Sequence, residues 1–182
     1  MRTASQYDEV IEGCKMVFLE KARDYGTSWR VLRLISVADQ LFIKARRIRT
    51  LQEKQTRKIG DDIRSEFMGI INYSVIGLLQ MRLAADTSEE LDLPALTSGY
   101  DECIQTARQL MHDKNHDYGE AWRDMSQESF ADLILVKLKR IRQILANDGV
   151  TRVSEGIDSN LLDILNYAAF ALILITEGKH TG

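Results

Sequence analysis

Basic side chains recur at helical spacing in two parts of the chain. Lys44 and Arg47 lie three residues apart, and so do Lys137 and Arg140. On a helix, residues at this spacing share one face. Two such cations could bind a phosphate, with the arginine making a bidentate contact. A solvated face, or ion pairs within the fold, would use the same residues.

Carboxylates lie close to the second basic segment. Glu128 and Asp132 are four residues apart, and Asp163 stands among leucines on a later helix. Oxygen ligands from adjacent helices suit Mg²⁺, and a buried carboxylate is costly unless it is paired or bound to metal. The sequence therefore predicts three metal ligands, which are Asp132, Asp163 and Glu155.

A phosphate-hydrolysing site could be built from the same region. In that mechanism the metal polarises a phosphoryl oxygen and activates water, and nearby cations neutralise the developing charge. The predicted catalytic residues are Asp163, Glu128, Lys137 and Arg140. The alternative is a structural ion pair between Asp163 and either Lys137 or Arg140.

The signature Lys-x-x-Asp-Tyr-Gly-x-x-Trp occurs twice, starting at Lys21 and at Lys114, 93 residues apart. Its charged and aromatic residues could surround a ligand pocket, with the tryptophan stacking on the ligand. Equally, the glycine could end a helix while the aromatic side chains pack in the fold. The predicted ligand-binding residues are Lys114, Asp117, Tyr118, Trp122 and Asn166 in the second copy, and Lys21, Asp24, Tyr25, Trp29, Lys44 and Arg47 in the first.

The duplication extends well beyond this signature. Positions 7–49 align with 100–142, and after a one-residue slip Asn72-Tyr73 aligns with Asn166-Tyr167. We expect one compact globular domain with a first repeat at 1–84, a connector at 85–99 and a second repeat at 100–182. The repeats differ in their carboxylates, since Ile35 aligns with Glu128 and Gly69 with Asp163. We therefore expect the competent site in the second repeat.

The elements that must position these residues are helices. A single proline and eleven glycines leave few loop signals, and apolar residues follow helical spacing from Tyr7 to Phe18. Second helices are expected at 38–51 and 131–145. Third helices are expected after Gly60-Asp61-Asp62 and near Asp158. The connector contains a Thr87-x-x-Glu90 capping-box pattern. The predicted fold is all-α, with two repeated three-helix units packed as a pseudo-twofold helical bundle.

Composition limits the functional classes. The net charge of −3 argues against a general nucleic-acid binder. Cys14 and Cys103 lack metal or disulfide spacing, and the N-terminus has no signal-peptide core, which together indicate a cytoplasmic protein with free thiols. The apolar stretch Leu161–Thr176 contains Asp163 and Asn166, so we expect a core helix and no membrane association.

Taken together, the signature, the Lys-x-x-Arg-Ile helix and the later Asp-x-x-Asn-Tyr resemble the nucleotide modification associated domain 1 family. This was formerly a bacterial and phage domain of unknown function, and two tandem copies would be present here. The resemblance implies a link to modified-nucleotide metabolism without an established reaction. A weaker likeness to all-α MazG and dimeric dUTPase pyrophosphohydrolases implies Mg²⁺ held by helical carboxylates.

We therefore expect an all-α protein that binds a nucleotide or nucleoside phosphate, with Mg²⁺-dependent hydrolysis as a further option. Two other interpretations stay open. One is a non-catalytic helical interaction module, in which the duplicated motif serves the fold alone. The other is a nucleic-acid backbone binder that uses the two basic helices, which predicts a steep dependence of affinity on salt.

Overall fold

The computed structural model describes residues 2–54, 62–152 and 155–182, and within them it is helical without any strand. The first repeat contains α1 (Arg2–Tyr25), the 3₁₀ helix η1 (Ser28–Val31), α2 (Leu34–Glu53) and α3 (Asp62–Arg82). The second contains α4 (Leu93–Tyr118), η2 (Ala121–Asp124), α5 (Gln127–Ala146) and α6 (Ile157–Thr176). The same series of elements occurs twice, and the predicted all-α bundle is confirmed.

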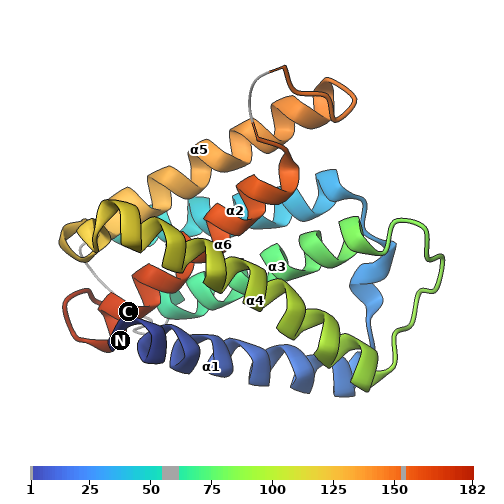
Figure 1. Ribbon diagram of the computed structural model, residues 1–182, viewed down its shortest axis with the longest axis horizontal. Helices are drawn as coiled ribbons and strands as arrows, with labels where there is room; N and C mark the ends of the chain where they lie inside the picture. The colour runs from blue at the N-terminus through green and yellow to red at the C-terminus, as the bar shows by residue number, and fades with distance from the viewer. Residues whose placement is uncertain (1, 55–61, 153–154) are drawn as a thin grey trace.

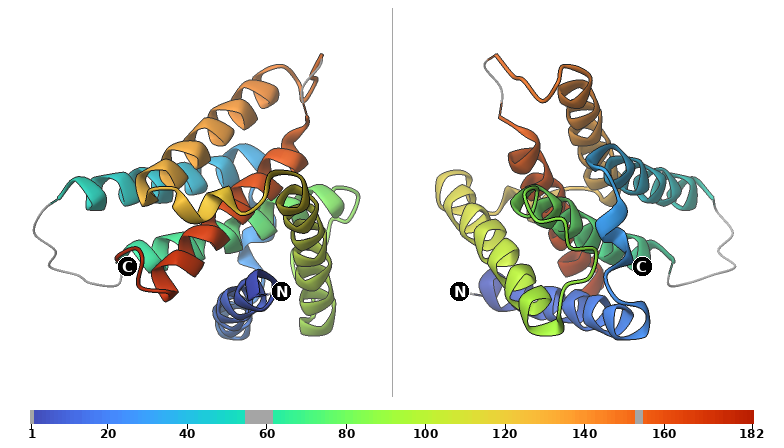
Figure 2. Two further views of the ribbon diagram at one scale, coloured as in Figure 1. Left: turned by 60° about the vertical axis from the view of Figure 1, so that its left-hand side comes forward. Right: turned by 90° about the vertical axis from the view of Figure 1, so that its right-hand side faces the viewer.

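The helices are arranged in three layers (Figure 1, Figure 2). The third helices of the repeats, α3 and α6, pack against each other at the centre. On one side α2 and α5 cover them, and on the other side α1 and α4 do so. The two repeats therefore share one core, which a single repeat could not enclose.

The central helix α6 is apolar along almost its whole length. By length and composition it could cross a membrane, but 78% of that stretch is buried inside the protein. Its core residues include Leu165, Ala168 and Ala169, none of which is exposed. The sequence prediction of a core helix is confirmed.

Crossed hydrogen bonds relate the two repeats. The Tyr7 hydroxyl of α1 donates to Asn166 Oδ1 of α6 at 2.8 Å, and the Tyr100 hydroxyl of α4 donates to Asn72 Oδ1 of α3 at 2.9 Å. Each asparagine also donates its amide to a carbonyl in the first helix of its own repeat, Asn72 to Cys14 and Asn166 to Ala107. The four bonds occupy matched positions, as a pseudo-twofold axis requires.

The glycine of each signature ends a helix. Gly26 has φ 70° after α1, and Gly119 has φ 66° after α4. In this left-handed region a side chain is strained, which explains why the signature keeps glycine twice. The predicted glycine caps are confirmed.

The connector is shorter than the range assigned to it from the sequence. α4 begins at Leu93, and Asp92 caps it by accepting a hydrogen bond from the Ala95 amide at 2.8 Å. Pro94 occupies the first turn, where its missing N–H costs nothing. The predicted capping box is wrong, because Glu90 instead accepts a hydrogen bond from the Thr27 amide at 3.1 Å.

Candidate functional site

A pocket of about 560 Å³ opens in the first repeat between α1, η1, α2 and α3. The first copy of the signature lines it through Lys21, Tyr25, Gly26 and Trp29. Further lining residues come from the second and third helices, and they include Lys44, Glu66, Gly69, Asn72 and Tyr73. The first-repeat residues predicted to bind a ligand, except Asp24 and Arg47, therefore share one cavity.

One part of the pocket wall is aromatic. Trp29 lies against Phe18, with ring centres 6.2 Å apart, and remains partly exposed. Tyr73 is also partly exposed, and its pKa is raised, first by burial and then by the neighbouring Tyr25. Its phenol is therefore protonated at neutral pH and can donate a hydrogen bond. Exposed ring faces beside a cavity suit a flat ligand.

The pocket also contains cations that are unevenly paired. Lys44 Nζ lies 3.6 Å from Glu66 Oε2 and 5.6 Å from the centre of the Tyr73 ring. Arg47 binds the other oxygen of Glu66 at 3.2 Å. Lys21, in contrast, makes no ion pair within residues 2–54, 62–152 and 155–182. A pocket ligand with negative charge would therefore meet a lysine that has no carboxylate partner in the described structure.

Gly69 gives Lys44 the space to lie across α3. A Cβ atom at this position would be 3.0 Å from both Cε and Nζ of Lys44. Any side chain here would have to displace the lysine or bind to it. The absence of a side chain at Gly69 thus leaves this space to the flexible end of Lys44.

The aligned position in the second repeat holds Asp163, whose carboxylate bridges two lysines. Oδ1 accepts a hydrogen bond from Lys114 Nζ at 2.6 Å, and Oδ2 lies 2.8 Å from Lys137 Nζ. Asp163 is only 5% exposed. Burial lowers the pKa of Lys114, but the hydrogen bond and charge of Asp163 outweigh burial and raise it overall. The alternative prediction of an ion pair with Lys137 is confirmed, with Lys114 as second partner in place of Arg140.

The second-repeat tryptophan is packed differently from the first. Trp122 is buried and stacks on Phe170, with ring centres 4.3 Å apart and planes 7° from parallel. Arg123 lies 4.4 Å from the Trp122 ring. The first repeat has the smaller Ile76 at the position of Phe170. The prediction that Trp122 stacks on a ligand disagrees with this packing, because protein side chains already cover its ring.

Asn166 was also predicted to bind a ligand, and its contacts indicate a structural role instead. The side chain is buried, and the hydrogen bonds to Tyr7 and Ala107 use its amide oxygen and nitrogen. Removing those bonds would leave buried polar groups unpaired, which is unfavourable. Asn166 joins the repeats and does not face a ligand.

Other signature residues lie on the surface. Asp24, Asp117 and Tyr118 are exposed, and Tyr118 has 79% of its surface accessible. Asp117 lies 3.2 Å from the ring of the adjacent His116. Asp24 therefore does not line the pocket of the first repeat, in contrast to the prediction.

The predicted magnesium ligands do not converge. Both carboxylate oxygens of Asp163 contact lysines. Asp132 is exposed on α5, and its carboxylate lies 3.8 Å from Arg49 of α2. That contact has a symmetric counterpart, because Asp39 binds Arg142 at 2.8 Å. Throughout the described parts of the chain, no three His, Cys, Asp or Glu side chains form a group that could hold a metal. These residues do not fit a magnesium centre, and the use of Mg²⁺ itself stays an untested prediction.

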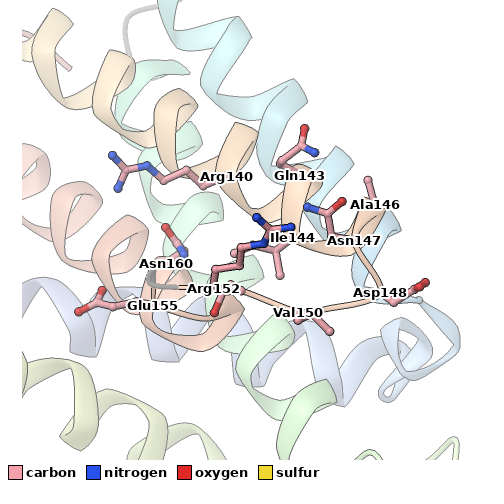
Figure 3. A pocket seen from close by; sticks show the side chains of 11 residues that line it. Arg140, Gln143, Ile144, Ala146, Asn147, Asp148, Val150, Arg152, Glu155 and Asn160 are labelled. Atoms are coloured by element: carbon pink, nitrogen blue, oxygen red, sulfur yellow. The ribbon is translucent and has the colours of Figure 1, made fainter.

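Arg140 and Glu155 line a second cavity of about 1080 Å³, at the end of α5 and the start of α6 (Figure 3). Asn160 also lines it, where the first repeat has Glu66. Arg140 therefore lacks the carboxylate that Arg47 binds. Glu128 lies apart from both residues, exposed in the first turn of α5. The four predicted catalytic residues do not form one site.

Sequence reasoning undervalued two positions in the pocket, Glu66 and Gly69. Gly69 was noted as a departure from the second repeat and was taken as loss of a site, whereas Glu66 was given no role. The informative signal was the retention of Lys21 and Lys44 beside a missing aspartate. Four signature residues of the first repeat share one pocket, whereas the competence of a site in the second repeat stays a prediction.

Comparison with known proteins identifies the family. No curated protein and no solved structure matches the chain significantly. The weaker resemblance to MazG and dUTPase enzymes accordingly finds no support there. The family model described as nucleotide modification associated domain 1 matches residues 21–81 and 114–175. The chain therefore belongs to the nucleotide modification associated domain 1 family, with a match in each of its two repeats.

Proposed function

We propose that the pocket of the first repeat binds a nucleotide or nucleoside phosphate. The observation that carries this proposal is the different state of the matched lysines. Lys114 and Lys137 are both bound to Asp163 in the second repeat, whereas Lys21 in the first repeat faces a cavity without a described ion-pair partner. A lysine without a described carboxylate partner in an open pocket suits an anionic ligand.

The shape and lining of the pocket support the same ligand class. Its volume of about 560 Å³ is within the usual range for small-molecule sites. Trp29 and Tyr73 provide flat faces for a base, while the lysines provide charge for a phosphate. The family description independently associates this domain with nucleotide modification.

The proposal concerns binding. Hydrolysis requires groups that activate water and polarise the phosphoryl oxygen. Glu66 is the carboxylate that lines the pocket, and both of its oxygens contact cations. The described pocket residues therefore give no support for hydrolysis. Mg²⁺-dependent hydrolysis remains a prediction from the sequence.

Isothermal titration of the full chain with common nucleosides and their mono-, di- and triphosphates tests the proposal. We expect one or more phosphorylated members to bind, and Lys21→Ala to weaken that binding at least tenfold. Lys114→Ala is the matched control in the second repeat and should leave affinity unchanged. Failure of every nucleotide to bind, or equal effects of both substitutions, would contradict the proposal.

A further inference from the structure

We infer that the ligand of the first-repeat pocket carries a single phosphate group, as in a nucleoside monophosphate, and that Gly69 is the position that determines this specificity. The inference rests on the proposed function of the pocket. In addition, we specify that the ligand has one phosphate group, that this group binds between Lys21 and Lys44, and that Gly69 leaves the room for it.

The second repeat shows how an oxyanion sits between the matched lysines. The Asp163 carboxylate presents one oxygen to Lys114 at 2.6 Å and the other to Lys137 at 2.8 Å. A phosphate has the same capacity to bridge two ammonium groups through separate oxygens. The Asp163 carboxylate thus occupies an anion-binding position between Lys114 and Lys137.

The first repeat keeps both lysines but has glycine at the position of Asp163. Lys21 and Lys44 line the pocket together with Gly69. The end of the Lys44 side chain lies over Gly69, with Cε and Nζ 3.0 Å from the position that a Cβ would take. A phosphate that displaces this flexible end of Lys44 can bind there and bridge Lys21 and Lys44.

Charge limits the number of phosphates. A phosphate monoester carries a charge of about −1.5 to −2 at neutral pH, which two lysines can neutralise. Glu66 lies one turn from Gly69 on the same face of α3 and is also part of the pocket lining. Further phosphates would bring negative charge towards this carboxylate, which lowers their affinity. A single phosphate is the group that best fits this arrangement.

A ligand panel separates this inference from the proposed function. The panel contains nucleosides, their monophosphates and triphosphates, and inorganic phosphate, each titrated with and without Mg²⁺. We expect a monophosphate to bind without Mg²⁺, at least tenfold more tightly than its nucleoside, its triphosphate or phosphate alone. Tighter binding of the triphosphate, or a requirement for Mg²⁺, would overturn the inference while leaving the proposed function intact. If no member binds, both are wrong.

Substitution of Gly69 tests the position of the phosphate. In Gly69→Asp, the new carboxylate should bind Lys21 and Lys44 as Asp163 binds its lysines. We expect monophosphate affinity to fall at least a hundredfold, with a melting temperature equal to or above that of the parent protein. Unchanged affinity in Gly69→Asp would contradict the inference.

Two further variants separate charge from volume. Gly69→Ala adds a Cβ against the flexible end of Lys44, and we expect a loss of only a few fold in affinity. Gly69→Asn has the size of aspartate without its charge, and it should keep clearly more affinity than Gly69→Asp. If Asn and Asp reduce affinity equally while both proteins remain folded by circular dichroism, volume decides and the bridging phosphate is wrong.

Discussion

The third helices of the two repeats carry their carboxylate one helical turn apart. In α3 the acid is Glu66, followed by Gly69, whereas in α6 the aligned positions hold Asn160 and Asp163. This shift changes the partners. Glu66 contacts Lys44 and Arg47, while Asp163 contacts the two lysines Lys114 and Lys137. Moving one charge by one turn thus changes which cations the carboxylate contacts.

The signature tryptophans of the two repeats also differ in how far other side chains cover them. Trp122 is covered by Phe170, whereas Trp29 remains partly exposed beside a cavity. A shared signature therefore serves the fold in both repeats, and its surroundings decide whether it can also serve a ligand.

Replacing the tryptophans should give the largest effect. Trp122→Ala removes a buried, stacked ring, and we expect a loss of about 4 kcal/mol in the free energy of unfolding. Trp29→Ala should cost about half as much, since the ring is partly exposed, but it should reduce nucleotide affinity. Urea denaturation and titration measure the two quantities. Equal losses of stability would mean that the two tryptophans have equivalent roles.

Removing the third-helix carboxylates should give the next largest effect. Asp163→Ala leaves the partly buried Lys137 without its partner, and we expect a loss of about 3 kcal/mol in the free energy of unfolding. Glu66→Ala should cost about 1 kcal/mol, because its contacts with Lys44 and Arg47, at 3.6 and 3.2 Å, are longer than the contacts of Asp163. Both values come from urea denaturation at neutral pH. A larger loss of stability for Glu66→Ala than for Asp163→Ala would contradict the view that the second repeat holds the stronger ion pairs.

Acid should weaken the turn of the second repeat more than that of the first. Hydrogen bonds from Thr3 and Arg123 lower the pKa of Glu120, and hydrogen bonding by Gln6 and nearby cations lower that of Glu177. Because both pKa values are lower in the folded state, their stabilisation is present above the usual value of 4.5 and is lost as pH falls below it.

Hydrogen exchange resolved by peptide at pH 7 and at pH 3 measures this difference. We expect η2 and the start of α1 to lose protection first. The first-repeat turn is instead held by Gln80, which donates to the carbonyls of Trp29, Arg30 and Leu32, and should be less sensitive to acid. Glu120→Gln combined with Glu177→Gln should flatten the pH dependence, and an unchanged profile would contradict the assignment.

The crossed ion pairs between α2 and α5 should give the smallest effect, equal in the two repeats. Asp39→Asn and Asp132→Asn each remove one exposed contact, and we expect losses of about 0.5 kcal/mol in the free energy of unfolding. Thermal unfolding with and without Mg²⁺ measures them. If Mg²⁺ raises the melting temperature of the parent protein and of Asp39→Asn but not of Asp132→Asn, then Asp132 is a metal ligand as the sequence predicted.

The architecture could be predicted from the sequence because its signals are local or repeated. Helical spacing around Tyr7 and Tyr100, the cap glycines Gly26 and Gly119, and the matched asparagines all indicated duplicated helices. The capping box at Thr87 and Glu90 was wrongly predicted, because these residues fit a local pattern while Glu90 makes a tertiary contact. Glu90 binds the Thr27 amide, a residue that is distant in sequence.

The site was only partly predictable, because side-chain partners come from different helices. Sequence alignment of the repeats showed that Asp163 lacks a counterpart, but it could not show that Lys114 of α4 and Lys137 of α5 both reach it. Nor could it show that Phe170 covers Trp122. Charge type and spacing identify candidate residues, whereas packing decides which of them are already satisfied.

The crossed contacts have a consequence for how the protein could diversify. Tyr7 of the first repeat binds Asn166 of the second, and Tyr100 of the second binds Asn72 of the first. Two identical subunits form such reciprocal contacts across a twofold axis. In a homodimer every substitution appears twice, so glycine and aspartate could not coexist at the matched position. Joining both copies in one polypeptide removes this constraint and fixes their one-to-one ratio. Gene fusion would thus let one copy keep a stabilising carboxylate while the other lost it.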